Sequence, residues 1–183
     1  MRAAVAILIF VVVCAGAGIL LIESGRYDIS ATKQHTALTR WIFSETMDNS
    51  VRYHAGDIDA PPLTDSTKIL TGFFHYRSMC AECHGAPGVA PEELAAGLNP
   101  PAPDLADAAK DWSPAELYWI TKNGVKMTGM PAWGPTHTDD ELWAVVAFTK
   151  QLPGMTPERY RALGRLAQKE SPGGHVETHG KSR

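Results

Sequence analysis

The chain has 183 residues, of which 17 are Lys or Arg and 20 are Asp or Glu. This length accommodates one ordinary globular domain together with extensions. Between residues 63 and 155, six basic side chains stand against eleven acidic ones. A net-negative surface of this kind argues against nucleic acid as a partner.

The first predicted element is an apolar helix over residues 3–22. This run of 20 residues contains no charged side chain, and about 20 apolar residues suffice to span a bilayer. A cleaved signal peptide is the alternative, because Ala15 and Ala17 offer the small side chains of a cleavage site. The apolar run continues past that site through Ile22. We therefore expect residues 1–22 to form an uncleaved membrane anchor.

Residues 23–62 are expected to form a juxtamembrane helix and a proline-rich hinge. The helix is predicted over 32–55, which contain neither Gly nor Pro, and the hinge over 56–62. The helix carries a partial apolar stripe made of Leu38, Trp41, Ile42, Met47 and Val51. This stripe suits a strut that packs on the side of the domain or on the bilayer interface. The alternative is a helix that docks on a partner membrane subunit.

The next helix is predicted over residues 66–79, which contain no proline. Its apolar residues recur at helical spacing, namely Ile69, Leu70, Phe73 and Phe74. Asp65 or Ser66 is suited to cap its first turn.

This helix runs into the sequence Cys80-Ala81-Glu82-Cys83-His84. The C-x-x-C-H spacing is the attachment signature of a c-type haem. Two thiols at this spacing reach the two vinyl groups of one porphyrin edge, and the following imidazole is placed beneath the iron as a ligand. A zinc site is the alternative, but zinc usually takes four ligands and the only other cysteine is Cys14. The sequence thus predicts one covalently bound haem c at Cys80, Cys83 and His84.

The second half of the region is predicted to be helical with irregular connections. Residues 85–103 are rich in Gly and Pro and are expected to form a loop. One helix begins with Ser113-Pro114 and Glu116 and ends at Asn123-Gly124; another begins with the acidic run after Thr138. Their expected apolar faces are Leu117, Trp119 and Ile120 in the first helix and Leu142, Val145, Val146 and Thr149 in the second. No stretch alternates with period two, so no sheet is expected.

A candidate for the second axial ligand of the iron lies between these helices. Met130 is preceded by Gly129 and followed by Pro131, so its segment is stiff, turn-rich and unable to continue a helix. Such a loop can place a thioether sulfur against iron. His/Met ligation raises the reduction potential and fills both axial sites, which favours electron transfer. Met127 is the competing candidate; it lacks the following proline.

Residues 156–183 are expected to form a short helix over 157–168 and a flexible tail from residue 171 onward, where Gly, Pro, His and Lys dominate.

These motifs resemble the class I cytochromes c, in the single-haem, membrane-anchored bacterial branch. The resemblance covers about residues 63–155. It rests on Cys80, Cys83, His84, Met130-Pro131, Gly72-x-x-x-Tyr76 and Leu142-Trp143-x-x-x-Ala147-Phe148. It implies an all-α cytochrome c fold wrapped around one covalent haem, with the first and last helices of the domain crossing. Since c-type haem is attached outside the cytoplasmic membrane in bacteria, it also implies an inner-membrane protein with its haem domain in the periplasm.

Three functions are compatible with this sequence. The first is a membrane-tethered electron carrier, not an enzyme, between respiratory partners such as a dehydrogenase, a quinol-oxidising complex or a terminal oxidase. The second is the electron-exit subunit of one multisubunit dehydrogenase or oxidase. The third is an open-haem ligand sensor or peroxidase-type enzyme, which requires Met130 to be absent from the iron. For an electron carrier that associates with a basic partner, Glu82, Glu92 and Glu93 are candidates to steer that partner toward the haem motif.

Overall fold

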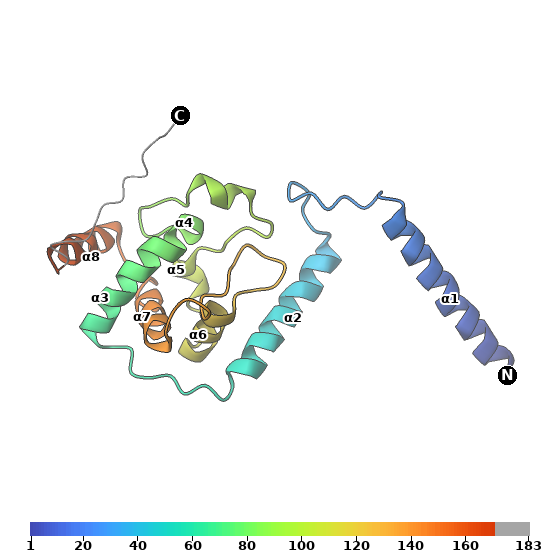
Figure 1. Ribbon diagram of the computed structural model, residues 1–183, viewed down its shortest axis with the longest axis horizontal. Helices are drawn as coiled ribbons and strands as arrows, with labels where there is room; N and C mark the ends of the chain where they lie inside the picture. The colour runs from blue at the N-terminus through green and yellow to red at the C-terminus, as the bar shows by residue number, and fades with distance from the viewer. Residues whose placement is uncertain (171–183) are drawn as a thin grey trace. The chain divides into compact units, whose positions relative to one another are not determined.

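The computed structural model describes residues 1–170 and divides into two compact units, residues 1–34 and the residues from 35 onward. The first unit contains the helix α1 (Arg2–Glu23) (Figure 1). This helix is long and apolar enough to cross a membrane, and none of its side chains is buried. It agrees with the apolar helix expected at the N-terminus. The expected tail from residue 171 onward lies outside the described residues.

The second unit is built from helices. In chain order these are α2 (Ala37–Ala55), α3 (Ser66–His75), the π-helix η1 (Tyr76–Cys80), α4 (Ala81–His84), the 3-10 helix η2 (Glu93–Gly97), α5 (Leu105–Ala108), α6 (Pro114–Asn123), α7 (Asp139–Thr149) and α8 (Pro157–Glu170). Residues 1–170 contain no β-strand, only an isolated bridge between Ala86 and Val89. The predicted all-α fold is confirmed.

The predicted helix starts are set by side chains that accept hydrogen bonds from free backbone N–H groups. Asp65 accepts from the amides of Thr67 and Lys68 at the start of α3. The capping boxes of α6 and α7 are complete, from Ser113 and Glu116 in one and Thr138 and Glu141 in the other.

Two expected helix boundaries were wrong, and a short helix was missed. The juxtamembrane helix begins at Ala37 rather than at residue 32, because Thr36 caps it by accepting a hydrogen bond from the amide of Thr39. The helix expected over 66–79 changes at Tyr76 into a π-helix. A π turn holds one residue more than an α turn and often marks a functional site. The short helix α5, which lies between the loop expected over residues 85–103 and α6, was not foreseen.

The core of this unit forms where α3 crosses α7 (Figure 1). Gly72 lies at the crossing, where its Cα faces the carbonyl of Ala144 and the Cβ of Phe148. Next to it, the ring of Phe73 packs edge-on against that of Phe148, with ring centroids 5.4 Å apart. Tyr160 of α8 packs on the same Phe73 ring at 5.2 Å. The absence of a side chain at Gly72 lets the two helices approach closely enough for these rings to meet.

The buried surfaces of α6 and α7 differ from the predicted ones. In α6, Leu117, Tyr118 and Thr121 are buried, whereas Trp119 and Ile120 are only partly covered. In α7, every residue in the range 142–149 is buried. The predicted inner stripe of α7 was too narrow because α3 and α6 both pack on this helix, so it has no solvent face beyond its first turn.

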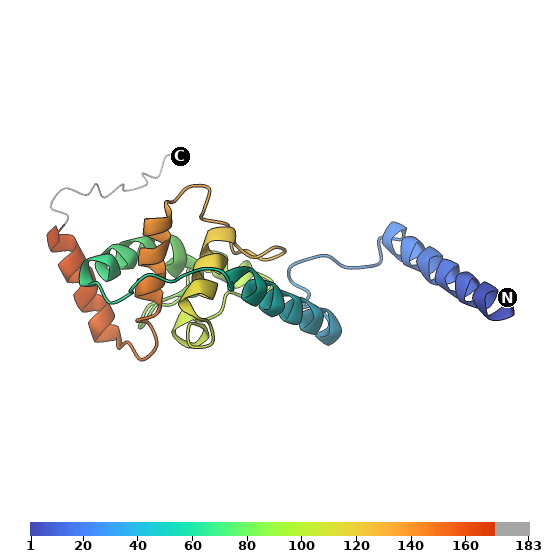
Figure 2. The same ribbon diagram turned by 90° about the horizontal axis from the view of Figure 1, so that it is seen from below.

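The helix α2 belongs to the second unit. It packs against α6, and it lies at the opposite end of this unit from α8 (Figure 2). The juxtamembrane helix therefore packs on the second unit through α6.

Substitution of Gly72 by Ala is expected to destabilise the domain. A helical Gly→Ala change normally gains up to about 1 kcal/mol from helix propensity. Here the new methyl group would collide with the backbone carbonyl of Ala144, and overpacking of this kind costs about 1–3 kcal/mol or more. Gly97→Ala is the matched control, since no atom lies within 4 Å of an added Cβ there. Thermal unfolding of the two variants should show a lower midpoint for Gly72→Ala alone.

Candidate functional site

The two cysteines of the C-x-x-C-H run lie on consecutive short helices. Cys80 ends η1 and is 6% exposed, and Cys83 is partly buried in α4. Burial, reinforced by the nearby Cys83, raises the pKa of the Cys80 thiol to about 12. The thiol is therefore neutral at physiological pH. Both cysteines are free and line the same cavity.

The imidazole of His84 is held in one orientation by the backbone. Its Nδ1 lies 2.7 Å from the carbonyl oxygen of Pro103. A carbonyl can only accept a hydrogen bond, so Nδ1 carries the proton and Nε2 keeps a free lone pair. Burial lowers the pKa of His84, and the hydrogen bond to Pro103 opposes only part of this effect. At neutral pH the side chain is thus a neutral imidazole, which is the form that binds metals.

The turn after His84 is fixed by Tyr76 and Gly85. The buried Tyr76 hydroxyl donates a 2.7 Å hydrogen bond to the carbonyl oxygen of Gly85. Gly85 has φ +65, and an added Cβ would come within 2.9 Å of the Val89 carbonyl oxygen. The tight turn that follows α4 therefore requires glycine at this position, because the turn needs a positive φ and leaves no room for a Cβ.

Met130 is held by a tight loop that begins after α6. Gly124 has φ +65, and its Cα faces the backbone of Pro131 and Ala132. The amide of Val125 donates to the Met130 carbonyl oxygen at 3.2 Å, and the amide of Met130 donates to the Thr128 hydroxyl at 3.0 Å. Met130 lines the same cavity as the two cysteines and His84. Met127, with φ 60, is 72% exposed and does not line that cavity.

The cavity has mostly apolar walls. They are formed by residues from α5, α6, α7 and the loop before α5, among them Leu98, Leu105, Ile120, Val145 and Val146. Two thiols, an imidazole with a free nitrogen and a thioether thus line one apolar space. This set of groups fits a covalently attached haem with nitrogen and sulfur axial ligands. Within residues 1–170 no group of three or more His, Cys, Asp or Glu side chains is placed to hold a metal ion.

Sequence reasoning missed two residues that line this cavity from other parts of the chain. Met47 reaches it from α2, and Trp112 from the turn before α6. Met47 belongs to the apolar stripe noted in the sequence, but periodicity alone does not show what an apolar face covers. No sequence pattern predicted a position at the cavity for Trp112, because this residue lies outside any regular secondary structure element.

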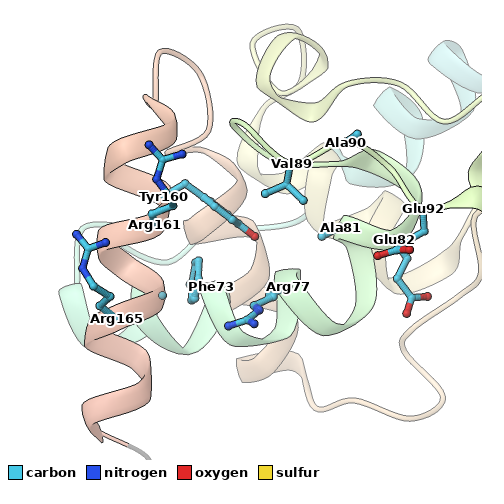
Figure 3. Close-up of a pocket in the computed structure, with 11 residues that line it drawn as sticks. Phe73, Arg77, Ala81, Glu82, Val89, Ala90, Glu92, Tyr160, Arg161 and Arg165 are labelled. Atoms are coloured by element: carbon cyan, nitrogen blue, oxygen red, sulfur yellow. The ribbon is translucent and has the colours of Figure 1, made fainter. Parts of the chain in front are cut away.

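A second hollow lies on the outer side of the haem-motif helix (Figure 3). Glu82 and Glu92 stand on one side of it, and Arg161 and Arg165 of α8 stand on the other; Arg77 of η1 lies between them. Phe73, Tyr160 and Gly164 are among its apolar lining. The surface beside the haem motif therefore carries both charges. The sequence predicted a net-negative surface for residues 63–155. The helix α8 follows that segment and adds positive charge beside the haem motif.

Comparison with known families identifies the matched part of the chain. Residues 67–148 match the family described as cytochrome C oxidase, cbb3-type, subunit III. This segment is a class I c-type cytochrome domain. Such a domain carries covalently bound haem c and transfers electrons. No curated protein matches the chain.

The cytochrome domain begins in α3 and ends in α7, and it contains Cys80, Cys83, His84 and Met130. Two helices of the same compact unit, α2 and α8, lie outside the matched residues. These two helices bring Met47 to the cavity and the arginines Arg161 and Arg165 to the hollow of Figure 3.

Proposed function

We propose that the chain is a membrane-anchored monohaem cytochrome c of the periplasm, which passes single electrons between respiratory partners. In this proposal Cys80 and Cys83 would attach the haem, and His84 and Met130 would bind its iron. The observation that carries the proposal is the placement of all four side chains on one cavity while Met127 is exposed.

Each residue contributes a defined part of this function. A bound haem c would supply a one-electron ferric/ferrous couple. Cys80 and Cys83 hold the group covalently, and the Pro103 carbonyl keeps Nε2 of His84 available as a ligand. The Met130 thioether would bind the iron of such a group and keep oxygen and other ligands from it. The apolar walls exclude water and thereby tune the reduction potential.

Orientation follows from the site of haem attachment. With α1 as a single span, we infer that Met1 faces the cytoplasm and the cytochrome domain faces the periplasm. Protease added to spheroplasts should then digest the cytochrome domain and leave the N-terminal segment in the membrane. A domain that stays intact until the membrane is permeabilised would place it on the cytoplasmic side and contradict the proposal.

A subunit role in a larger complex is the second candidate. The matched family is described as a subunit of an oxidase, and α2 exposes large apolar side chains at Leu38 and Trp41. In this case the electron leaves the assembly through the same haem. The electron-transfer chemistry is unchanged, but the partner stays permanently bound.

Salt dependence of electron transfer separates the two candidates. For a diffusing carrier with a basic partner, replacing both Glu82 and Glu92 with Gln should slow association about tenfold at low salt, because opposite charges steer encounter. The difference should shrink as salt rises, since the screening length falls to about 8 Å at physiological ionic strength. Arg165→Gln, on the opposite side of the hollow, should act in the opposite direction. A rate that is independent of salt in all variants would indicate a fixed subunit.

A further inference from the structure

The helix α2 lies outside the matched cytochrome segment, yet it is firmly packed on the cytochrome domain. Met47, Val51 and Ala55 recur every four residues and so share one face of the helix. Val51 is 1% exposed and Ala55 is 4% exposed. The helix packs against α6, and burial of these two apolar side chains stabilises the packing more than a surface ion pair does.

Polar contacts set the register of α2 on the domain. The Arg52 side chain lies 4.0 Å from the Glu116 carboxylate, and its guanidinium lies 5.9 Å from the ring centroid of Trp112. The imidazole of His54 stacks on Trp119 with ring centroids 5.4 Å apart. These contacts bind α2 to two tryptophans on or next to α6, one of which lines the haem cavity.

One turn before Val51, the same face of α2 reaches that cavity through Met47. The preceding turns of the helix do not line it; Leu38, Trp41 and Ile42 are 64%, 61% and 45% exposed. Met47 is thus the point at which a helix from outside the cytochrome segment contributes to the wall around the candidate haem site.

We propose that α2 is a built-in cover for the haem cavity, and that Met47 is a positioning residue that keeps water out of it. This inference rests on the proposed function. The ferric haem carries one more positive charge than the ferrous haem, and a drier, more apolar environment disfavours the more highly charged state. The cover therefore raises the reduction potential.

The test is the reduction potential of Met47 variants in the full-length, haem-loaded protein in detergent. Met47→Gln keeps the length of the side chain but makes it polar. At equilibrium with a mediator dye, this variant should have a ratio of oxidised to reduced haem about three- to tenfold higher than the wild type. A tenfold change corresponds to a reduction potential lower by about 59 mV for a one-electron couple. Met47→Leu should keep the wild-type reduction potential, since Leu has a similar volume to Met and is also apolar. Val51→Ala, which loosens α2, should shift the potential in the same direction as Met47→Gln.

Two controls make the result decisive. Leu38→Gln lies on the exposed part of α2 and should leave the potential unchanged. The covalent haem content of each purified variant, measured by mass, shows separately whether the site binds haem at all. If haem is attached and Met47→Gln has the wild-type potential, the cover is refuted while the proposed function stands. If the wild-type chain carries no haem, the proposed function itself fails. A potential lowered equally by Met47→Leu and Met47→Gln would refute water exclusion and indicate a direct role of the Met47 sulfur.

Discussion

Replacement of both Cys80 and Cys83 by Ala should abolish covalent haem attachment completely. The two thiols line the apolar cavity beside His84, and the only other cysteine, Cys14, lies on α1. No other side chain in the sequence can form a thioether in their place. Mass spectrometry of the denatured chain should show the mass of the polypeptide alone.

Single replacements of these cysteines and of Cys14 complete this experiment. Cys80→Ala or Cys83→Ala should leave one thioether or a chain without haem. Cys14→Ala should keep the full haem mass. Haem that remains covalently bound to the double variant would show that attachment does not use this motif. The double variant should also unfold at a lower temperature than the haem-loaded protein, because a small domain buries limited surface without the cofactor.

Substitution of Met130 by Ala should lower the reduction potential and open the haem to added ligands. Axial ligands set haem potentials over about 0.8 V, and loss of a Met ligand should cost on the order of 0.1 V or more. The weak ferric absorption of the sulfur–iron bond at long wavelength should disappear. Reduced protein should then bind carbon monoxide, which the wild-type protein should resist because both axial positions are filled.

Met127→Ala is the matched control for this experiment. Both methionines lie in the same loop, but Met127 is 72% exposed, so its removal should leave the absorption, the potential and the response to carbon monoxide unchanged. The opposite pattern would make Met127 the ligand. Binding of carbon monoxide by the wild-type protein would instead favour an open haem and a sensor or peroxidase-type function.

The helix starts of the cytochrome domain could be predicted because their causes are local. A cap needs only a side-chain oxygen and backbone amides two or three residues away, as at Asp65, Ser113 and Thr138. Helix ends and changes of helix type were harder to predict. The π-helix from Tyr76 to Cys80 accompanies contacts distant in sequence, including the burial of Tyr76 against Phe148 of α7 at 5.1 Å.

Burial was predicted less well than secondary structure, for a related reason. The periodicity of a helix reports which side is apolar, but not how many neighbours surround it. The complete burial of α7 after its first turn follows from the crossing with α3, which Gly72 permits, and from the packing of α6. Neither neighbour could be assigned to α7 by the spacing of its apolar residues.

The sequence by itself predicted the chemistry proposed for this protein, because the motif for haem attachment consists of residues that are close together along the chain. The spacing of Cys80, Cys83 and His84 predicts a c-type haem, and the Gly-Met-Pro run at Met130 predicts a candidate ligand, without any knowledge of the fold. Only the tertiary structure decided what surrounds that chemistry. Met47 reaches the cavity, and Arg161 and Arg165 stand opposite Glu82 and Glu92, because α2 and α8 pack on the domain through contacts between residues distant in sequence.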